Sequence, residues 1–373
     1  MKLTIKKEVL LDGINKVSKA LSTKNLVPVL SGIKFDLTEK GLLLTASDND
    51  ITIQVFIDRT DDMKIEKEGS IIIQGKYILD IVRKLPDEFI NIEVIDELKV
   101  IIYTDNSEFN LNGINKSEYP TISLDLSKNP LILNSRVFRS IISQTSFASS
   151  SDESRPILTG INFKITGNMM ECNSTDSYRL ARRMIQLNNT VDDNYNIVIP
   201  SKNLLEFVKI MDDSDEDIEL HIFNNKVLIK YQNILFQSRL INGTYPNTAN
   251  LLPDDFILTI TVNVSELYNV IDRASILTSD KEKNIVTFEI DGEKLYVRSN
   301  SAEIGRVEEK MNIEKDSSEN LRISFVAKYM MEALKSFDDD QVAISFVGEV
   351  KPIILKSSKD EGLTQLVLPI RTY

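Results

Sequence analysis

The chain is 373 residues long and carries 44 Lys and Arg against 56 Asp and Glu, a formal net charge of −12. This length predicts two or three domains, and the acidic balance argues against a protein that coats nucleic acid with its whole surface. No stretch approaches the run of roughly 18 apolar residues that a membrane span needs. The single cysteine, Cys172, cannot form an internal disulfide, so we expect a protein of the cytoplasm.

Strand and helix patterns alternate at the start of the chain. Residues 2–6 alternate as a strand does and lack the apolar core of a signal peptide. Apolar residues then recur three or four positions apart, which predicts a helix over 7–20 with one buried face, formed by Leu10, Ile14 and Val17. Strands are predicted at 32–37, 41–46, 52–57 and 70–74, and a further helix at 75–85.

The chain then repeats itself at a nearly constant offset. Residues 9–35 align without a gap with residues 137–163, 128 positions later, and identical residues meet at Val9 and Val137, Ala20 and Ala148, and Pro28 and Pro156. Residues in the second half of each repeat recur 126 positions apart. Lys76, Lys202 and Lys328 form one such series, and Tyr119-Pro120 recurs as Tyr245-Pro246. Short turns predict hairpins at Asp96-Glu97, Asn224-Asn225, Asp291-Gly292 and Gly348-Glu349.

These repeats predict an α+β protein of three tandem domains, over 1–125, 126–252 and 253–373. Each domain consists of two half-copies of strand, helix and further strands. Pro, Asn and Asp interrupt the periodic segments near both boundaries. A chain of like copies is more easily explained as a symmetric scaffold than as the frame of one catalytic site, because each copy would have to carry or lose the chemistry.

Positive charge is concentrated in the predicted helices. They hold 13 Lys and Arg against 7 Asp and Glu, a net charge of +6 against −18 for the rest, and cover residues 7–20, 75–85, 134–149, 200–211, 263–279 and 326–336. For any one helix the charge is equally explained by exposure to water. Over all of them it predicts a basic surface that holds a polyanion, and the absence of interleaved aromatic residues favours phosphate contacts without base readout.

Three strings in the second half of the chain carry a resemblance. They are TDSYRLA at residues 175–181, Tyr245-Pro246 followed by Leu251-Leu252-Pro253, and LVLPIR at residues 366–371. In this order and at these distances the chain resembles the bacterial DNA sliding clamps, the beta subunits of DNA polymerase III, over its whole length. The resemblance implies three clamp domains in a head-to-tail homodimeric ring, with helices inside and sheets outside.

Such a ring is a processivity factor without a catalytic group or cofactor. The resemblance implies that it encircles double-stranded DNA without sequence specificity, slides along it and tethers the replicative polymerase, and that an ATP-driven loader opens it. DNA-facing residues carried over from the family are Lys24, Arg155, Lys202, Lys281 and Lys283; for each of them a solvated surface position is the alternative. Ring closure would join Phe109 and Leu111 at one end of the protomer to Ile276 and Leu277 at the other. The last two could equally be core residues of a helix.

The resemblance also implies a pocket between the second and third domains. Short linear peptides from polymerases, the clamp loader and repair proteins would dock there, with apolar side chains seating one or two anchors and Arg179 and Arg371 at the rim. Tyr178 departs from the histidine often found at its place in the family. Without the resemblance, the segment from Leu366 to Ile370 would be assigned to an edge strand. The implied lining residues are Leu158, Thr175, Ser177, Tyr178, Arg179, Leu180, Pro246, Leu251, Val350, Pro352, Leu366, Leu368, Ile370 and Arg371.

Residue types that bind metals or catalyse reactions form no recognisable set. The only histidine, His221, has no second histidine or cysteine nearby and is predicted to be structural or on the surface. The acidic run at 212–217 lacks the glycine and glutamate of a calcium loop and is predicted to be a solvated loop. Cys172 is predicted to be a small buried hydrophobe. We therefore expect no metal and no cofactor.

Two alternative functions remain at this point. One is a repeat-built adaptor that binds peptides without encircling DNA, against which the basic helices argue. The other is a metal-dependent hydrolase or nuclease that uses the many carboxylates. It would need Asp and Glu clustered at strand ends, and the copies share no such cluster.

Overall fold

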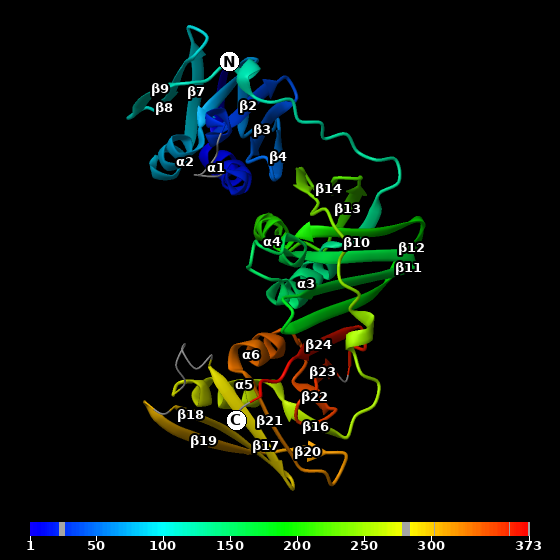
Figure 1. Cartoon of the computed structure of the whole chain (residues 1–373). Coiled ribbons are helices and arrows are strands. Elements are labelled where there is room, and N and C mark those ends of the chain that lie inside the picture. Colours follow the sequence, from blue (N-terminus) through cyan, green and yellow to red (C-terminus); the bar gives the residue numbers. More distant parts are fainter. Residues whose placement is uncertain (22–26, 278–283, 302, 358, 372–373) are drawn as a thin grey trace. The chain divides into compact units, whose positions relative to one another are not determined.

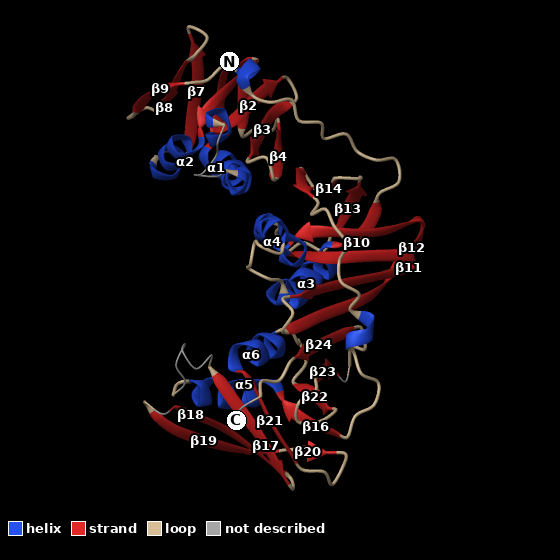
Figure 2. Ribbon diagram, in the orientation of Figure 1, coloured by secondary structure: helices blue, strands red, loops and turns tan. Residues whose placement is uncertain are grey.

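The protein folds into two compact units. The computed structural model describes residues 1–21, 27–277, 284–301, 303–357 and 359–371. One unit comprises residues 1–136 and 203–240, and the other comprises residues 137–202 and 241–373. Figure 1 follows the chain through both units, and Figure 2 distinguishes their helices from their strands. Among the described helices, none combines the length and the apolar character needed to cross a membrane.

The first unit begins with the predicted alternation of strands and helices. Leu10, Ile14 and Val17 of the first helix are fully buried, as its spacing predicts, and the helix continues to residue 20 as a 3-10 turn. In chain order the elements are β1 (Lys2–Lys6), α1 (Lys7–Val17), β2 (Gly32–Thr38), β3 (Gly41–Ser47), β4 (Ile51–Asp58), β5 (Met63–Lys67), β6 (Gly69–Gln74), α2 (Gly75–Lys84), β7 (Phe89–Ile95), β8 (Lys99–Tyr103) and β9 (Glu108–Asn112).

Two antiparallel sheets form the frame of this unit. The five-stranded sheet has the order β5-β1-β7-β8-β9. The eight-stranded sheet has the order β10-β13-β14-β15-β4-β3-β2-β6 and adds β10 (Leu131–Asn134), β13 (Asp217–Ile222), β14 (Lys226–Tyr231) and β15 (Ile234–Arg239). Helix α1 packs on β3, β4 and α2. Because β4 pairs with β15, segments far apart in sequence share one sheet.

The second unit contains the remaining strands and the helices α5 and α6. Helices α3 (Ser135–Thr145) and α4 (Ser201–Ile210) include residues of both units. The other elements are β11 (Gly160–Thr175), β12 (Arg179–Pro200), β16 (Leu258–Asn263), α5 (Val264–Ser275), β17 (Ile285–Asp291), β18 (Lys294–Ser301), β19 (Gly305–Asn312), β20 (Glu314–Lys315), β21 (Leu321–Val326), α6 (Ala327–Lys335), β22 (Gln341–Phe346), β23 (Ile353–Ser357) and β24 (Leu363–Val367).

The sheets of the second unit repeat the antiparallel design of the first. A seven-stranded sheet has the order β11-β12-β24-β23-β22-β16-β20, and a four-stranded sheet has the order β19-β18-β17-β21. Strands β11 and β12 form one long hairpin where the first repeat has separate shorter strands, and the hairpin is irregular near Gly167, whose φ is +59°. Helices α5 and α6 pack on each other over a core in which Phe288 and Phe325 meet edge to face, 4.6 Å between ring centroids.

Hairpin connections are present at the predicted turns, but two of them are longer than predicted. Asp96 and Glu97 both have positive φ, 48° and 66°, in a three-residue connection, since Ile95 pairs with Lys99. Gly292 has a φ of +57° in the two-residue turn between Asp291 and Lys294. The turn predicted at Gly348-Glu349 is instead a connection over residues 347–352, because β22 ends at Phe346 and β23 begins only at Ile353. Pro352, which has no N–H to donate, lies just before that strand.

Candidate functional site

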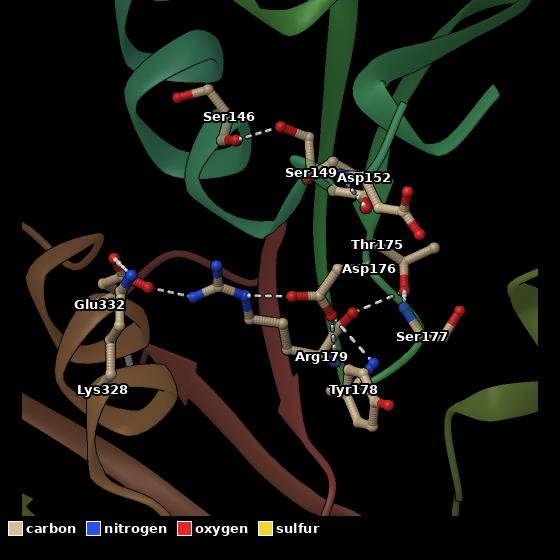
Figure 3. A network of polar contacts seen from close by, with 12 residues as sticks. Ser146, Ser149, Asp152, Thr175, Asp176, Ser177, Tyr178, Arg179, Lys328 and Glu332 are labelled. Carbon is tan, nitrogen blue, oxygen red and sulfur yellow. Dashed lines mark hydrogen bonds and ion pairs between the residues drawn. The ribbon is translucent and has the colours of Figure 1, made fainter. Parts of the chain in front are cut away.

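The turn between β11 and β12 is held by its own side chains (Figure 3). The Asp176 carboxylate accepts hydrogen bonds from the backbone N–H groups of Tyr178, at 2.9 Å, and Arg179, at 3.0 Å. The Thr175 hydroxyl donates to the Arg179 carbonyl at 2.6 Å and accepts from the Ser177 N–H at 3.1 Å. Ser177 has a φ of +80°, a conformation that favours glycine. The turn therefore places Tyr178 in a fixed position at the surface.

Arg179 connects this turn to helix α6. Its side chain is only 8% exposed, and its guanidinium pairs with Asp176 at 3.0 Å and with Glu332 of α6. The same guanidinium lies over the ring of Tyr329, 4.5 Å from its centroid, and over the ring of Phe147 at 5.4 Å. Two carboxylates and two aromatic rings thus surround one buried cation, which locks the turn onto the helix.

Tyr178 and Tyr329 form an aromatic pair next to this cation. Their ring centroids are 6.3 Å apart with an interplanar angle of 22°, and Tyr178 is 61% exposed. Burial raises the pKa of the Tyr329 phenol, and the nearby Asp176 carboxylate raises it further. Both rings combine an apolar face with a hydroxyl group, which suits contact with a partner's backbone or side chains.

An apolar cluster lies where β12, β24 and β23 are neighbours in the seven-stranded sheet. Leu180, Ile354 and Leu366 are buried at its centre, on β12, β23 and β24. Leu252, Phe256 and Leu368 pack against them and are only partly buried. The structure thus brings together Leu180, Leu366 and Leu368 as predicted. The prediction omitted Ile354, Leu252 and Phe256, although the apolar run 353–355 and the position of Leu252 next to Leu251 could have indicated them.

A second, smaller apolar cluster is connected to the turn through Tyr245. Leu158 is fully buried and packs with Val198 and Tyr245. The Tyr245 hydroxyl accepts a hydrogen bond from the Thr175 N–H at 3.0 Å. Burial raises the pKa of Tyr245, which keeps its hydroxyl neutral.

The other predicted lining residues lie in three segments of the chain. Pro246 and Leu251 are exposed in the segment before β16, and Val350 is exposed in the connection before β23. Pro352 and Ile370 are partly buried, and the Ile370 N–H donates to the Ser324 carbonyl at 2.7 Å, which attaches the end of the chain to β21. Arg371 is exposed.

Arg155, predicted to face DNA, lies at the turn itself. Its Nη1 donates to the Ser177 hydroxyl at 3.0 Å. Lys202 is exposed at the start of α4. The other DNA-facing predictions, Lys24, Lys281 and Lys283, lie outside the described residues.

The helical cations fall into two groups. Several are neutralised nearby: Lys16 pairs with Asp12 at 2.7 Å, and Arg273 makes a two-pronged pair with Glu309 at 2.8 and 3.0 Å. The second group is exposed and forms no ion pair within the described part of the chain; it comprises Lys19, Lys76, Arg83, Lys84 and Lys202. This second group is available to an external anion.

The four residues predicted for ring closure differ in exposure. Phe109 is exposed and Leu111 is partly buried on β9, an edge strand of the five-stranded sheet. Ile276 is 71% exposed directly after α5, and Leu277 beside it is partly buried. Ile276 is therefore not a core residue of the helix, which removes the alternative for that position.

His221 and Asp212 serve the structure of the first unit. His221 is buried, its Nδ1 accepts from the Ser127 N–H at 3.0 Å, and its Nε2 lies 3.3 Å from a carboxylate oxygen of Glu219. The Asp212 carboxylate accepts from Tyr231, from the Ser214 N–H at 3.1 Å and from Gln232 at 3.1 Å. Hydrogen bonds from Ser214 and Tyr231 hold the pKa of Asp212 well below its usual range.

Comparison with known proteins gives matches over the whole chain. Three family models described as DNA polymerase III beta subunit match the chain. The N-terminal-domain model matches residues 1–123, the central-domain model matches residues 132–247, and the C-terminal-domain model matches residues 249–371. The beta sliding clamp of Staphylococcus epidermidis is 40% identical, with 100% of both chains covered. Among solved structures, the DNA polymerase sliding clamp from Bacillus subtilis has 39% identity and a TM-score of 0.96. The beta subunit of the DNA polymerase from Streptococcus pyogenes has 33% identity and a TM-score of 0.96. Each match covers 100% of this chain and 100% of the other chain.

Proposed function

Since the chain belongs to the DNA polymerase III beta subunit family, we propose that two copies close head to tail as a ring around duplex DNA and hold the replicative polymerase on its template. Members of this family are processivity factors without a catalytic group, and the function of this chain is that of a sliding clamp. The observation that carries the proposal is the match of three clamp-domain models in tandem, which leaves few residues outside them.

The charge distribution suits sliding. The exposed, unpaired helical cations, such as Lys76 and Arg83, can contact phosphates, and each such contact is weak and screened by salt. A closed ring is held by topology and not by affinity, so weak contacts do not release it from a continuous duplex. Contacts to phosphate also carry no sequence information, which allows movement along any sequence.

The docking site for partner peptides is proposed at the apolar cluster around Leu180 and Leu366, with the Tyr178–Tyr329 pair at its border. Leu368 is only partly buried there and is available to an apolar anchor residue. Arg155 and Arg371 are exposed and can meet the acidic or backbone groups of an extended peptide. The proposed partners are the replicative polymerase, the clamp loader and repair proteins.

Ring closure is proposed through the exposed apolar residues at β9 and after α5. Phe109 and Ile276 are the exposed members of the two groups. A contact between different surfaces of identical subunits closes a ring only when the rotation between them is right, and a dimer satisfies this with two equal interfaces.

The domain boundaries 1–125, 126–252 and 253–373 are proposed on the same basis. The matched ranges 1–123, 132–247 and 249–371 begin and end within six residues of these bounds, which supports them. The proposed location is the cytoplasm, where a bacterium replicates its DNA.

Processive synthesis tests the proposed function. The polymerase, the loader and ATP are supplied with a primed single-stranded circle, with and without the chain. We expect long products from single binding events only when the chain is present. Products of equal length in both reactions would contradict the proposal.

A further inference from the structure

The turn between β3 and β4 has the same hydrogen bonds as the docking-site turn. The Asp48 carboxylate accepts from the N–H groups of Asp50, at 3.0 Å, and Ile51, at 2.8 Å. The Ser47 hydroxyl donates to the Ile51 carbonyl at 3.0 Å and accepts from the Asn49 N–H at 3.4 Å. Asn49 has a φ of +78°. Each bond, and the positive φ, has its counterpart 128 positions later.

The strands that follow the two turns also pair in the same register. Thr52 lies opposite Gln237 where β4 pairs with β15, as Leu180 lies opposite Leu366 where β12 pairs with β24. We call residues 47–52 with 226–239 the first junction, and residues 175–180 with 352–368 the second junction.

The two junctions also have equivalent backbones at a third strand and in the residues that follow the paired strands. Leu228 pairs with Gln237 in the first junction as Ile354 pairs with Leu366 in the second. After the ladders, the N–H of Arg239 donates to the Asp50 carbonyl at 2.9 Å, and the N–H of Leu368 donates to the Tyr178 carbonyl at 2.9 Å. The chain therefore contains the backbone of the docking site twice.

The side chains at these equivalent positions differ in polarity. Three leucines contribute to the apolar cluster of the second junction. Their counterparts in the first junction are polar: Thr52 for Leu180, Gln237 for Leu366 and Arg239 for Leu368. Thr52 is buried and hydrogen-bonded to the Ser47 hydroxyl at 2.9 Å, so it is fixed within the turn.

Lys226 also makes the first junction unfavourable for an apolar anchor residue. It stands at the position of Pro352, since Lys226 lies two residues before Leu228 as Pro352 lies two residues before Ile354, and these two residues are equivalent. Its ammonium donates to the Ser123 carbonyl at 2.6 Å and to the Gln237 amide oxygen at 3.1 Å. An apolar anchor seated here would bury this ammonium or break its bonds, and an unsatisfied buried polar group is costly.

We infer that Lys226, Gln237 and Arg239 restrict apolar peptides to the second junction, and that the first junction is a docking site closed by these three side chains. The inference rests on the proposed docking function. This closure explains how a chain built from repeats presents one peptide site. The three side chains decide which of the two equivalent junctions can bind a peptide.

The test opens the first junction and counts bound peptides. The opened variant combines Lys226→Ala, Gln237→Leu and Arg239→Leu. The probe is a fluorescein-labelled peptide from the replicative polymerase that binds the unmodified chain, and calorimetry gives the stoichiometry. We expect one peptide per unmodified chain and two per opened chain. A matched control makes the same kinds of change at exposed positions outside both junctions, Lys40→Ala, Gln341→Leu and Arg59→Leu, and should still bind one peptide.

The reciprocal variant, Leu366→Gln with Leu368→Arg, places the polar residues in the second junction. We expect it to lose binding at least a hundredfold, and we expect the opened changes to restore one peptide per chain when added to it. A folded combined variant that binds no peptide would overturn the inference. Unchanged affinity of the reciprocal variant would also overturn it, and this arm does not require the opened variant to fold. Failure of the unmodified chain to bind would instead refute the docking function.

Discussion

The guanidinium of Arg179 lies 4.5 Å from the ring centroid of Tyr329, although 150 positions separate the two residues in sequence. The contact attaches the docking-site turn to α6, and Asp176 and Glu332 neutralise the cation. The exposed Tyr178 therefore rests on a rigid support, which would lower the loss of conformational entropy when a peptide binds at the proposed site.

Replacing Arg179 by Met should destabilise the protein. The change leaves Asp176 and Glu332 without their partner in a largely buried place, and we expect a loss of about 3 kcal/mol in the free energy of unfolding. Urea denaturation measures it. Lys328→Met is the control, because Lys328 is exposed and 4.0 Å from Glu332, and it should cost about 0.5 kcal/mol or less. Equal losses for the two variants would contradict the structural role of Arg179.

Replacing Leu368 and Ile370 together by Ala should abolish binding of a polymerase-derived peptide and leave the dimer intact. Leu368 packs on the apolar cluster while remaining accessible, so its loss removes the seat of an anchor residue. Fluorescence anisotropy measures peptide binding, and sedimentation measures the dimer. Loss of the dimer, or of the fold, would mean that these residues are core.

Replacing Ile276 by Glu should convert the dimer into monomers. The side chain is 71% exposed in the isolated chain, and burying a carboxylate in an apolar contact is unfavourable. Analytical ultracentrifugation should show the shift at micromolar concentration. Ile132→Glu, at another exposed isoleucine, should remain dimeric. An unchanged dimer for Ile276→Glu would place the interface elsewhere.

Asp212 should contribute stability that depends on pH. Hydrogen bonds from Ser214 and Tyr231 lower the pKa of its carboxyl in the folded state, so its contribution is present above the unfolded value near 3.8 and is lost as the pH falls through the folded value. Asp212→Asn should therefore lower Tm at pH 5 to 7, and the difference from the unmodified chain should shrink below about pH 4. Asp61→Asn, at an exposed turn, is the control. A difference that stays constant down to pH 2 would refute this role.

The sequence predicted the elements better than the contacts of the site. Apolar spacing identified helices such as α1, and the repeats located the hairpins, because both depend on residues close in sequence. The matching strings supplied Leu180, Leu366 and Leu368, which the structure joins. They did not supply the Arg179 contacts with α6, and they did not show that Leu158 is buried, because those properties depend on how distant segments pack.

Topology, and not affinity, should hold the ring on DNA. The direct measurement loads the protein with its loader onto a circular plasmid and onto the same plasmid cut once, and follows how long it stays bound to each. We predict long retention on the circle and rapid loss from the linear form, because a sliding ring leaves at free ends. Equal retention on both forms would contradict encirclement and would favour an adaptor that binds DNA weakly or not at all.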